Sequence, residues 1–149
     1  MAKSKPKPSH TPVRHHRSSF RNTTSRRNRG KAPGTLSAPA GAKESELRVI
    51  TYDANEVAES ASLDAPRRAV TWIDVVGLGS LELIEQIGRE FKLHALALED
   101  ALQSGQRAKV ESYADALFIV TRIAREADHM PDIEQVAMFL VKDFVTTFP

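Results

Sequence analysis

The chain has 149 residues, of which 41% are hydrophobic and none is cysteine. This length suits about one globular domain, and the lack of cysteine excludes a disulfide framework, a thiolate zinc site and a cysteine nucleophile. The net charge of +2 combines two unlike parts, because residues 1–43 hold 11 of the 21 Lys and Arg residues and no Asp or Glu, which leaves an acidic remainder.

Residues 1–43 are rich in proline, serine and arginine, and their bulky apolar side chains are Val13, Phe20 and Leu36. Such a segment buries too little apolar surface to offset the entropy lost on ordering. We therefore predict a disordered basic tail. Its cations could bind anionic lipid or nucleic acid, and a solvated tail without a dedicated partner is the alternative. A transit peptide is a weaker alternative, because the prolines oppose an amphipathic helix.

From residue 44 onward the chain alternates between strand and helix patterns. Residues 46–54 alternate apolar and polar side chains and are predicted to form a half-buried strand. Residues 55–68 are predicted to form a short helix or a loop. Residues 69–76 are rich in β-branched and aromatic side chains, which indicates a well-buried strand.

A Gly-Leu-Gly-Ser turn at residues 77–80 separates this strand from a predicted helix. Glycines at such a turn can cradle a dinucleotide, but the sixth position of that fingerprint is Glu82, whose carboxylate would repel a pyrophosphate. We interpret the segment as an ordinary turn in which Ser80 caps the helix. The helix is predicted over residues 80–91 from apolar side chains at helical spacing.

A second helix is predicted over residues 94–102, and the strands that follow are predicted within 109–126, 133–141 and 144–149. The last strand stops soon after it starts, so the chain is expected to be truncated. No apolar run reaches the 18 or more residues of a membrane-spanning helix, and no secretory signal is present. We therefore expect this piece to be soluble and cytosolic.

Glu99 and Asp100 are adjacent carboxylates within the second predicted helix. Consecutive helical residues point about 100° apart, so at least one of the two is expected to meet another element or another subunit. Paired carboxylates offer the oxygen ligands that suit Mg²⁺; a solvated helix face is the alternative. The cations that follow, Arg107 and Lys109, are expected to stabilise the helix end or to pair with carboxylates such as Glu99.

No constellation for catalysis is present in the predicted domain. Its histidines, His94 and His129, are isolated, so neither a His-rich zinc spacing nor an oriented nucleophile emerges. We do not expect an enzyme.

Four segments of the chain are distinctive when taken together: "TWIDVVGL", "FKLHALALEDALQSGQRAKVE", "ALFIV" and "EQVAMFLVKDFVTTF". In order and spacing they resemble the cytosolic N-terminal domain of the CorA family of magnesium and cobalt transporters. The similarity covers about residues 47–149. Its most specific part is "LHALALED" followed by "QRAKVE", where Ala108 stands in place of the proline that the family usually has.

This resemblance implies an α/β domain over residues 44–149, with a mixed sheet sandwiched between helical layers, incomplete at its C-terminus. It also implies a pentamer on the cytoplasmic side of the inner membrane, anchored through C-terminal helices that this sequence lacks together with the family's Gly-Met-Asn signature. Asp100 and then Glu99 inherit the role of regulatory ligands at a subunit interface for Mg²⁺, and possibly for Co²⁺. The fragment alone is not expected to transport ions.

Two other functions remain open from the sequence. One is a zinc-transporting branch of the same superfamily, because the part that selects the ion is missing here. The other is a stand-alone binding module whose cationic tail engages nucleic acid or anionic lipid.

Overall fold

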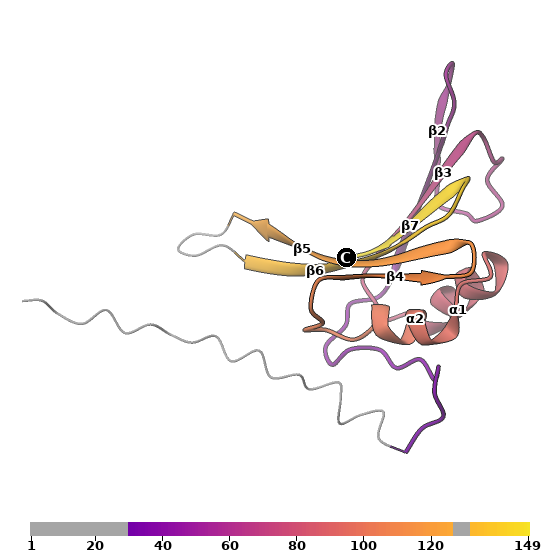
Figure 1. Ribbon diagram of the computed structural model, residues 1–149. Coiled ribbons are helices and arrows are strands. Elements are labelled where there is room, and N and C mark those ends of the chain that lie inside the picture. Colours follow the sequence, from indigo (N-terminus) through magenta and orange to yellow (C-terminus); the bar gives the residue numbers. More distant parts are fainter. Residues whose placement is uncertain (1–29, 127–131) are drawn as a thin grey trace, which may run out of the picture.

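A computed structural model describes residues 30–126 and 132–149. Within these ranges the chain forms a seven-stranded mixed sheet in the order β2-β1-β3-β7-β6-β5-β4, together with two helices (Figure 1). The elements are β1 Glu46–Tyr52, β2 Val57–Ser60, β3 Val70–Val76, α1 Leu81–Glu90, α2 Ala95–Ala101, β4 Lys109–Tyr113, β5 Ala116–Arg125, β6 Asp132–Leu140 and β7 Phe144–Phe148.

The sheet joins an antiparallel three-stranded part, with β1 between β2 and β3, to an antiparallel meander of β4 to β7 through one parallel pair. Strand β1 lies antiparallel to both β2 and β3, and the run from β4 to β7 is antiparallel throughout. Strands β3 and β7 pair in parallel. The mixed sheet expected for an α/β domain is therefore confirmed.

The prediction of a helix or loop over residues 55–68 was wrong in part, because Val57–Ser60 forms the edge strand β2. A tight turn decides the matter: the Asp53 amide donates to the Glu56 carbonyl at 3.0 Å, and the Asp53 carboxylate accepts the amides of Asn55 and Glu56. A side chain that binds its own backbone in this way sets up a hairpin turn.

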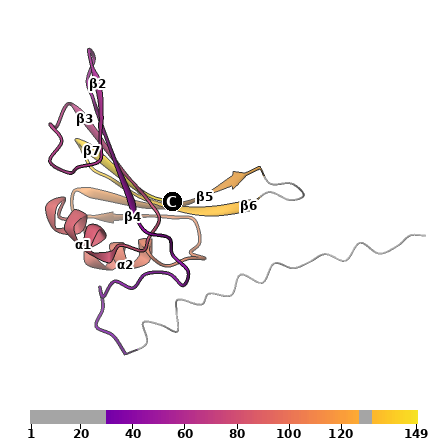
Figure 2. The same cartoon turned by 180° about the vertical axis from the view of Figure 1, so that it is seen from behind.

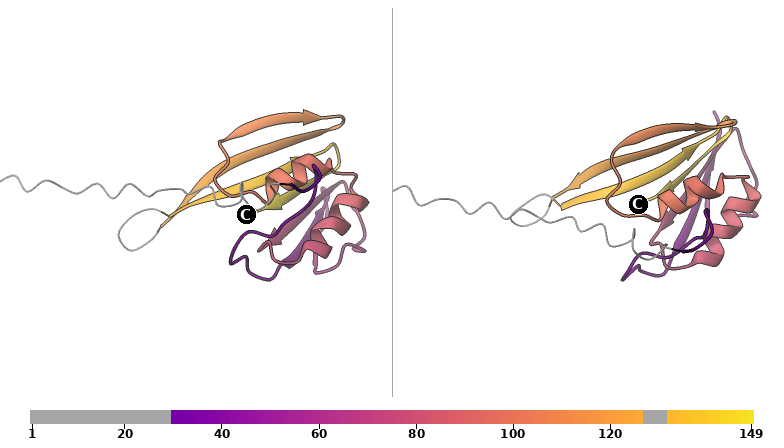
Figure 3. Two further views of the ribbon diagram at one scale, coloured as in Figure 1. Left: turned by 90° about the horizontal axis from the view of Figure 1, so that it is seen from below. Right: turned by 60° about the horizontal axis from the view of Figure 1, so that its bottom comes forward.

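Both helices lie on the same face of the sheet and cover its core (Figures 1 and 3). Helix α1 buries Ile84 and Ile87 completely, and a Cβ at Gly88 would come within 2.4 Å of a Leu98 methyl group, so the glycine allows α1 and α2 to touch. Burial of these apolar side chains supplies the main stabilisation of the fold. The sheet residues beneath the helices include Ile73, Val75, Phe118, Phe139 and Phe148, each at most 1% exposed.

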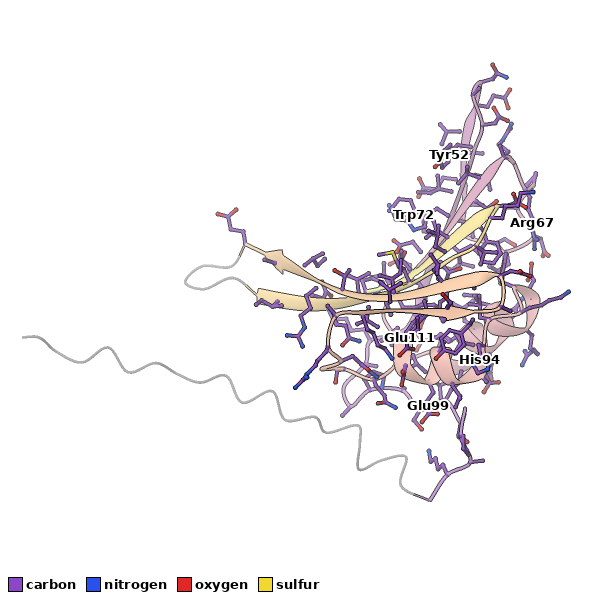
Figure 4. All side chains as sticks on the ribbon, in the orientation of Figure 1. Tyr52, Arg67, Trp72, His94, Glu99 and Glu111 are labelled. Carbon is purple, nitrogen blue, oxygen red and sulfur yellow. The ribbon has the colours of Figure 1, made fainter. Side chains whose placement is uncertain are left out.

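The opposite face of the sheet is less covered. Trp72 lies there, away from the helices (Figure 4), and donates to Thr147, whose hydroxyl donates in turn to Asp74 at 2.6 Å. Apolar side chains on this face near the strand ends, such as Leu140 and Ile123, are 45% and 39% exposed. In the described ranges both helices lie on the other face, so a second helical layer stays a prediction.

The predicted tail boundary at residue 43 differs from the structure. Residues 30–43 run beside the helices (Figure 2), where Leu36 packs against the core cluster. Disorder is thus the wrong description for this stretch, because Leu36 finds apolar partners that the tail composition does not reveal. Residues 1–29 lie outside the described part.

Candidate functional site

The acidic pair lies on α2, where a short run of Ala and Leu residues forms a helix. Ala97, Leu98 and Ala101 face the core and are at most 5% exposed, whereas Leu96 is 44% exposed. Glu99 and Asp100 follow the buried Leu98 and point to either side of it. Each carboxylate consequently meets a different part of the chain, as the helical geometry predicted.

Glu99 binds the N-terminal segment. The backbone amide of Gly34 donates to Glu99 Oε2 at 2.8 Å, and Figure 4 shows the Glu99 side chain directed away from the sheet. Gly34 has φ +81°, and a Cβ there would lie 3.0 Å from the Ala95 methyl group. A glycine is required at this position because of both the backbone conformation and the close approach.

Asp100 binds strand β4 through Lys109. The Lys109 ammonium donates to Asp100 Oδ2 at 2.6 Å and to Glu111 Oε1 at 3.0 Å. It also lies 5.4 Å from the centre of the buried Phe118 ring. Pairing of Lys109 with a carboxylate was predicted, but the partner is Asp100 rather than Glu99.

The network continues along the same face of β4. Tyr113 donates its hydroxyl to Glu111 Oε2 at 3.0 Å, and its ring stacks on His94 with centroids 4.6 Å apart. Lys109, Glu111 and Tyr113 are spaced two residues apart on β4, so all three lie on one face of the strand. Figure 4 shows Glu111 of this set on the side of α2. The structure thus joins the two halves of the segment 93–111 into one polar cluster.

Charge and hydrogen bonding shift the pKa values of three members of this cluster. Burial lowers the pKa of the Lys109 ammonium, but the hydrogen bonds to Asp100 and Glu111 outweigh it, so the net shift is upward. The hydrogen bonds from Lys109 and then from Tyr113 lower the pKa of Glu111. Burial and then the bond to Glu111 raise the pKa of the Tyr113 hydroxyl. All three shifts favour the charge states that the network shows.

The donor chemistry of this surface fits a hard divalent cation only in part. Asp100 and Glu99 offer carboxylate oxygens of the kind that Mg²⁺ prefers. However, no group of three or more His, Asp or Glu side chains that could hold a metal occurs in residues 30–126 and 132–149. An ion at Asp100 would complete its coordination with water or with groups from another subunit.

Sequence reasoning missed two partners in this site. Gly34 was placed in a tail expected to be disordered, and no local pattern points from it to Glu99. His94 was regarded as isolated, although its Tyr113 partner lies on the same strand face as Glu111. The period-two spacing of Lys109, Glu111 and Tyr113 was the available signal, because it places all three on one face of a strand.

Residues 43–45 of the chain pack against the Gly-Leu-Gly-Ser turn and take up the space beside its glycines. Gly79 donates its amide to the Lys43 carbonyl at 2.8 Å, and a Cβ at Gly77 would lie 2.4 Å from the Glu44 carbonyl oxygen. Ser80 stands at the N-cap of α1, but its hydroxyl donates to Glu44 and makes no side-chain cap bond. Ser80 is therefore the N-cap residue, as predicted, but without a cap bond from its hydroxyl, and packing by residues 43–45 supports an ordinary turn.

The described helices do not include one that is both long and apolar enough to cross a membrane. Two kinds of comparison relate the chain to known sequences. A family model described as "CorA-like Mg2+ transporter protein" matches residues 68–149. The "Cobalt/magnesium transport protein CorA" of Thermotoga maritima is 32% identical over 130 residues, a match that covers 80% of this chain and 37% of that relative. The chain thus spans well under half of the relative's length.

Two solved structures share the fold. The complete CorA magnesium transporter from Methanocaldococcus jannaschii matches with a TM-score of 0.57 and 11% identity, over 68% of this chain and 31% of that chain. The soluble domain of CorA from the same organism matches with a TM-score of 0.53 and 12% identity, over 68% and 39%. At these identities the likeness concerns the fold alone.

Proposed function

Because the chain belongs to the family of CorA-like Mg²⁺ transporter proteins, we propose that it is the cytosolic, divalent-cation-sensing part of a magnesium or cobalt transporter. The relative from Thermotoga maritima carries both ions in its name, which supports magnesium and cobalt over the zinc-transporting alternative. The role is one of sensing and assembly rather than catalysis.

The acidic pair on α2 is the observation that carries the proposal. The side chain of Asp100 is 29% exposed, so its carboxylate is accessible yet fixed on a helix packed against the core. Mg²⁺ commonly binds through one or two carboxylates and keeps several waters. One chain supplies an incomplete ligand set, and a neighbouring subunit would supply the rest.

The proposed mechanism is electrostatic. Residues 44–149 carry more acidic than basic side chains, so acidic faces of adjacent subunits repel each other when no divalent ion is bound. A cation held between Asp100 and a neighbouring subunit, with Glu99 beside it, would remove this repulsion and favour the closed assembly. Magnesium would then oppose its own further entry.

The complete assembly is proposed to be a pentamer on the cytoplasmic side of the inner membrane. The partly exposed face of the sheet around Trp72 is proposed to receive the second helical layer, because apolar side chains such as Leu140 and Ile123 are otherwise left in water. The basic residues before Lys43 are proposed to lie along anionic lipid, whose surface potential attracts such segments.

A magnesium titration of the 149-residue chain, followed by amide chemical shifts in NMR spectra, tests the sensing site. We expect the shifts to centre on Glu99, Asp100 and their neighbours in α2 and β4. Asp100→Asn should abolish them, since the amide removes the charge but keeps the shape. Ionic strength is held constant with NaCl, so that screening does not change during the titration.

Asp53→Asn is the matched control, because Asp53 is another partly exposed carboxylate paired with a cation. It should leave the magnesium response at α2 unchanged. If the shifts in α2 and β4 were the same with Asp100→Asn as in the natural chain, the assignment of Asp100 as a ligand would be wrong.

A further inference from the structure

The contact between Lys109 and Asp100 has a consequence for cation sensing. We propose that the Lys109 ammonium is a built-in competitor for the divalent cation: it must leave Asp100 before Mg²⁺ can bind there, and this exchange sets the magnesium concentration at which the site fills. This inference rests on the sensing role proposed for Asp100.

The first observation is that Lys109 donates a hydrogen bond to Asp100 Oδ2, the carboxylate oxygen that a metal ion would bind. Its nitrogen lies 2.6 Å from Asp100 Oδ2, which is short for a charge-assisted hydrogen bond between an ammonium and a carboxylate. A second cation at the same oxygen would be repelled strongly over so short a distance. The ammonium and the divalent ion are therefore alternative partners of Oδ2.

The second observation is that the Lys109 ammonium has a second carboxylate partner, which it can keep when it leaves Asp100. Glu111 already accepts one of its hydrogen bonds at 3.0 Å, and Glu111 is itself held by the Tyr113 hydroxyl, whose ring stacks on His94. Release from Asp100 leaves Lys109 paired with Glu111. Exchange then costs one hydrogen bond of the ammonium and does not strand a buried charge.

The third observation is the chemistry of lysine. A lysine ammonium is a strongly hydrated point charge on a flexible four-carbon stem, whereas arginine binds carboxylates through a rigid fork. The side chain of Lys109 is 24% exposed, so water can take over the donor that Asp100 gives up. These properties suit a cation that yields its place reversibly.

The two carboxylates of the pair differ in this respect. Glu99 Oε2 accepts the backbone amide of Gly34, whereas the Lys109 ammonium donates to Asp100 and Glu111. Asp100 is paired with a full positive charge. Competition by Lys109 therefore acts on Asp100, and Glu99 adds negative charge beside it.

The test compares magnesium dissociation constants, measured by NMR titration of the 149-residue chain, for Lys109→Gln, Lys109→Arg and Arg107→Gln. Lys109→Gln should bind Mg²⁺ about three- to fivefold more tightly, which is the upper part of the range expected from losing a partly exposed ion pair. Lys109→Arg should stay weak, because it keeps a cation on Asp100. Spectra without magnesium establish that each variant is folded.

Arg107→Gln is the matched control, because it removes the same charge from an exposed position two residues away. It should change the dissociation constant by less than about twofold, since exposed charges are screened. Equal effects of Arg107→Gln and Lys109→Gln, or no effect of Lys109→Gln, would overturn the competition.

A double variant separates this inference from the sensing role. With Asp100→Asn, adding Lys109→Gln should give no further gain in affinity, because the contested oxygen has lost its charge. A natural chain that binds Mg²⁺ through Asp100 with no change in Lys109→Gln contradicts the competition alone. Absence of Asp100-dependent binding in both the natural chain and Lys109→Gln contradicts the sensing role itself.

Discussion

A cation lies between two carboxylates at both edges of the sheet, and the two groups differ in how they are built. Near the β1–β2 turn the cation is an arginine, whereas beside the edge strand β4 it is a lysine. We name them the Arg68 group and the Lys109 group. Their members are Asp53, Arg68 and Glu56 in the first, and Asp100, Lys109 and Glu111 in the second.

In the Arg68 group the Asp53 carboxylate stabilises the backbone of its own turn. Asp53 Oδ1 accepts the amides of Asn55 and Glu56 at 2.8 Å and 3.0 Å, while Oδ2 accepts Arg68 at 3.0 Å. The Asn55 amide, then Arg68, then the Glu56 amide hold the pKa of Asp53 below its usual value. Removing the arginine would leave the turn in place.

In the Lys109 group the pair joins two separate elements, α2 and β4. Asp100 meets a side chain here rather than the amides of its own turn. The comparison shows that two groups with the same charges, one cation and two carboxylates, can differ in function. A carboxylate fixed by its own backbone closes a turn, whereas one held by a flexible lysine can change partners.

The largest expected effect tests whether one core supports both groups. Phe139 on β6 is fully buried, and its ring centroid lies 4.9 Å from that of Phe118 and 6.1 Å from that of Phe148. Phe139→Ala should lower the free energy of unfolding by about 3–5 kcal/mol, through lost burial and the cavity left behind. Urea denaturation followed at amides near Asp53 and near Asp100 measures this.

Leu140→Ala is the control on the same strand, because Leu140 is 45% exposed on the other face. Its cost should be well below that of Phe139→Ala. If amides near the two groups unfolded at different urea concentrations in Phe139→Ala, the two edges would not share one cooperative core.

The next effect separates the two groups by their response to magnesium. At a concentration ten times its dissociation constant, an ion that binds the native state stabilises it by about 1.4 kcal/mol. We expect this gain, measured by thermal denaturation in MgCl₂ against NaCl of equal ionic strength, in the natural chain and in Asp53→Asn. Asp100→Asn should lose it. The same gain in all three proteins would mean that magnesium stabilises the chain from elsewhere.

Local patterns in the sequence predicted most of the fold. Helix α1 and strand β3 have apolar periods of their own, so they could be placed without knowledge of their neighbours. Strand β2 could not, because its four residues are largely exposed and its hairpin depends on the Asp53 side chain. A turn fixed by a polar side chain leaves no apolar period to detect.

The candidate site was less predictable for a different reason. The acidic pair could be recognised, but the partner of Asp100 depends on where β4 lies beside α2, and tertiary packing sets that position. One partner of Glu99 is the backbone amide of Gly34, 65 residues away in the sequence. Backbone donors carry no residue signature, so such a contact cannot be predicted from side-chain chemistry.

A smaller effect concerns the Thr146 hydroxyl, which is buried like the core but lacks, within the described residues, the hydrogen bonds that the side chains of the Arg68 and Lys109 groups make. Thr146 on β7 is fully buried, and its hydroxyl finds no hydrogen-bond partner in the described part of the chain. Thr146→Val should raise the free energy of unfolding by about 1 kcal/mol, because the burial cost of the unpaired hydroxyl disappears. Urea denaturation measures it, and Thr146→Ser, which keeps the hydroxyl, should not be stabilising.

The smallest effect isolates the Arg68 group through pH. The pKa of Asp53 is lowered from 3.8 by the Asn55 amide, then Arg68, then the Glu56 amide, so its ionised form stabilises the fold. That contribution is fully present above about pH 3.8 and is lost as the pH falls through the lower pKa of the folded state. The stability difference between the natural chain and Asp53→Asn should therefore be constant at neutral pH and shrink in strong acid. Because the group is exposed the change is small, and urea denaturation at several pH values is required to resolve it.

A stability difference that persisted unchanged to the lowest pH would show that Asp53 acts through the shape of the turn and not through its charge. The electrostatic likeness between the two edges of the sheet would then be lost.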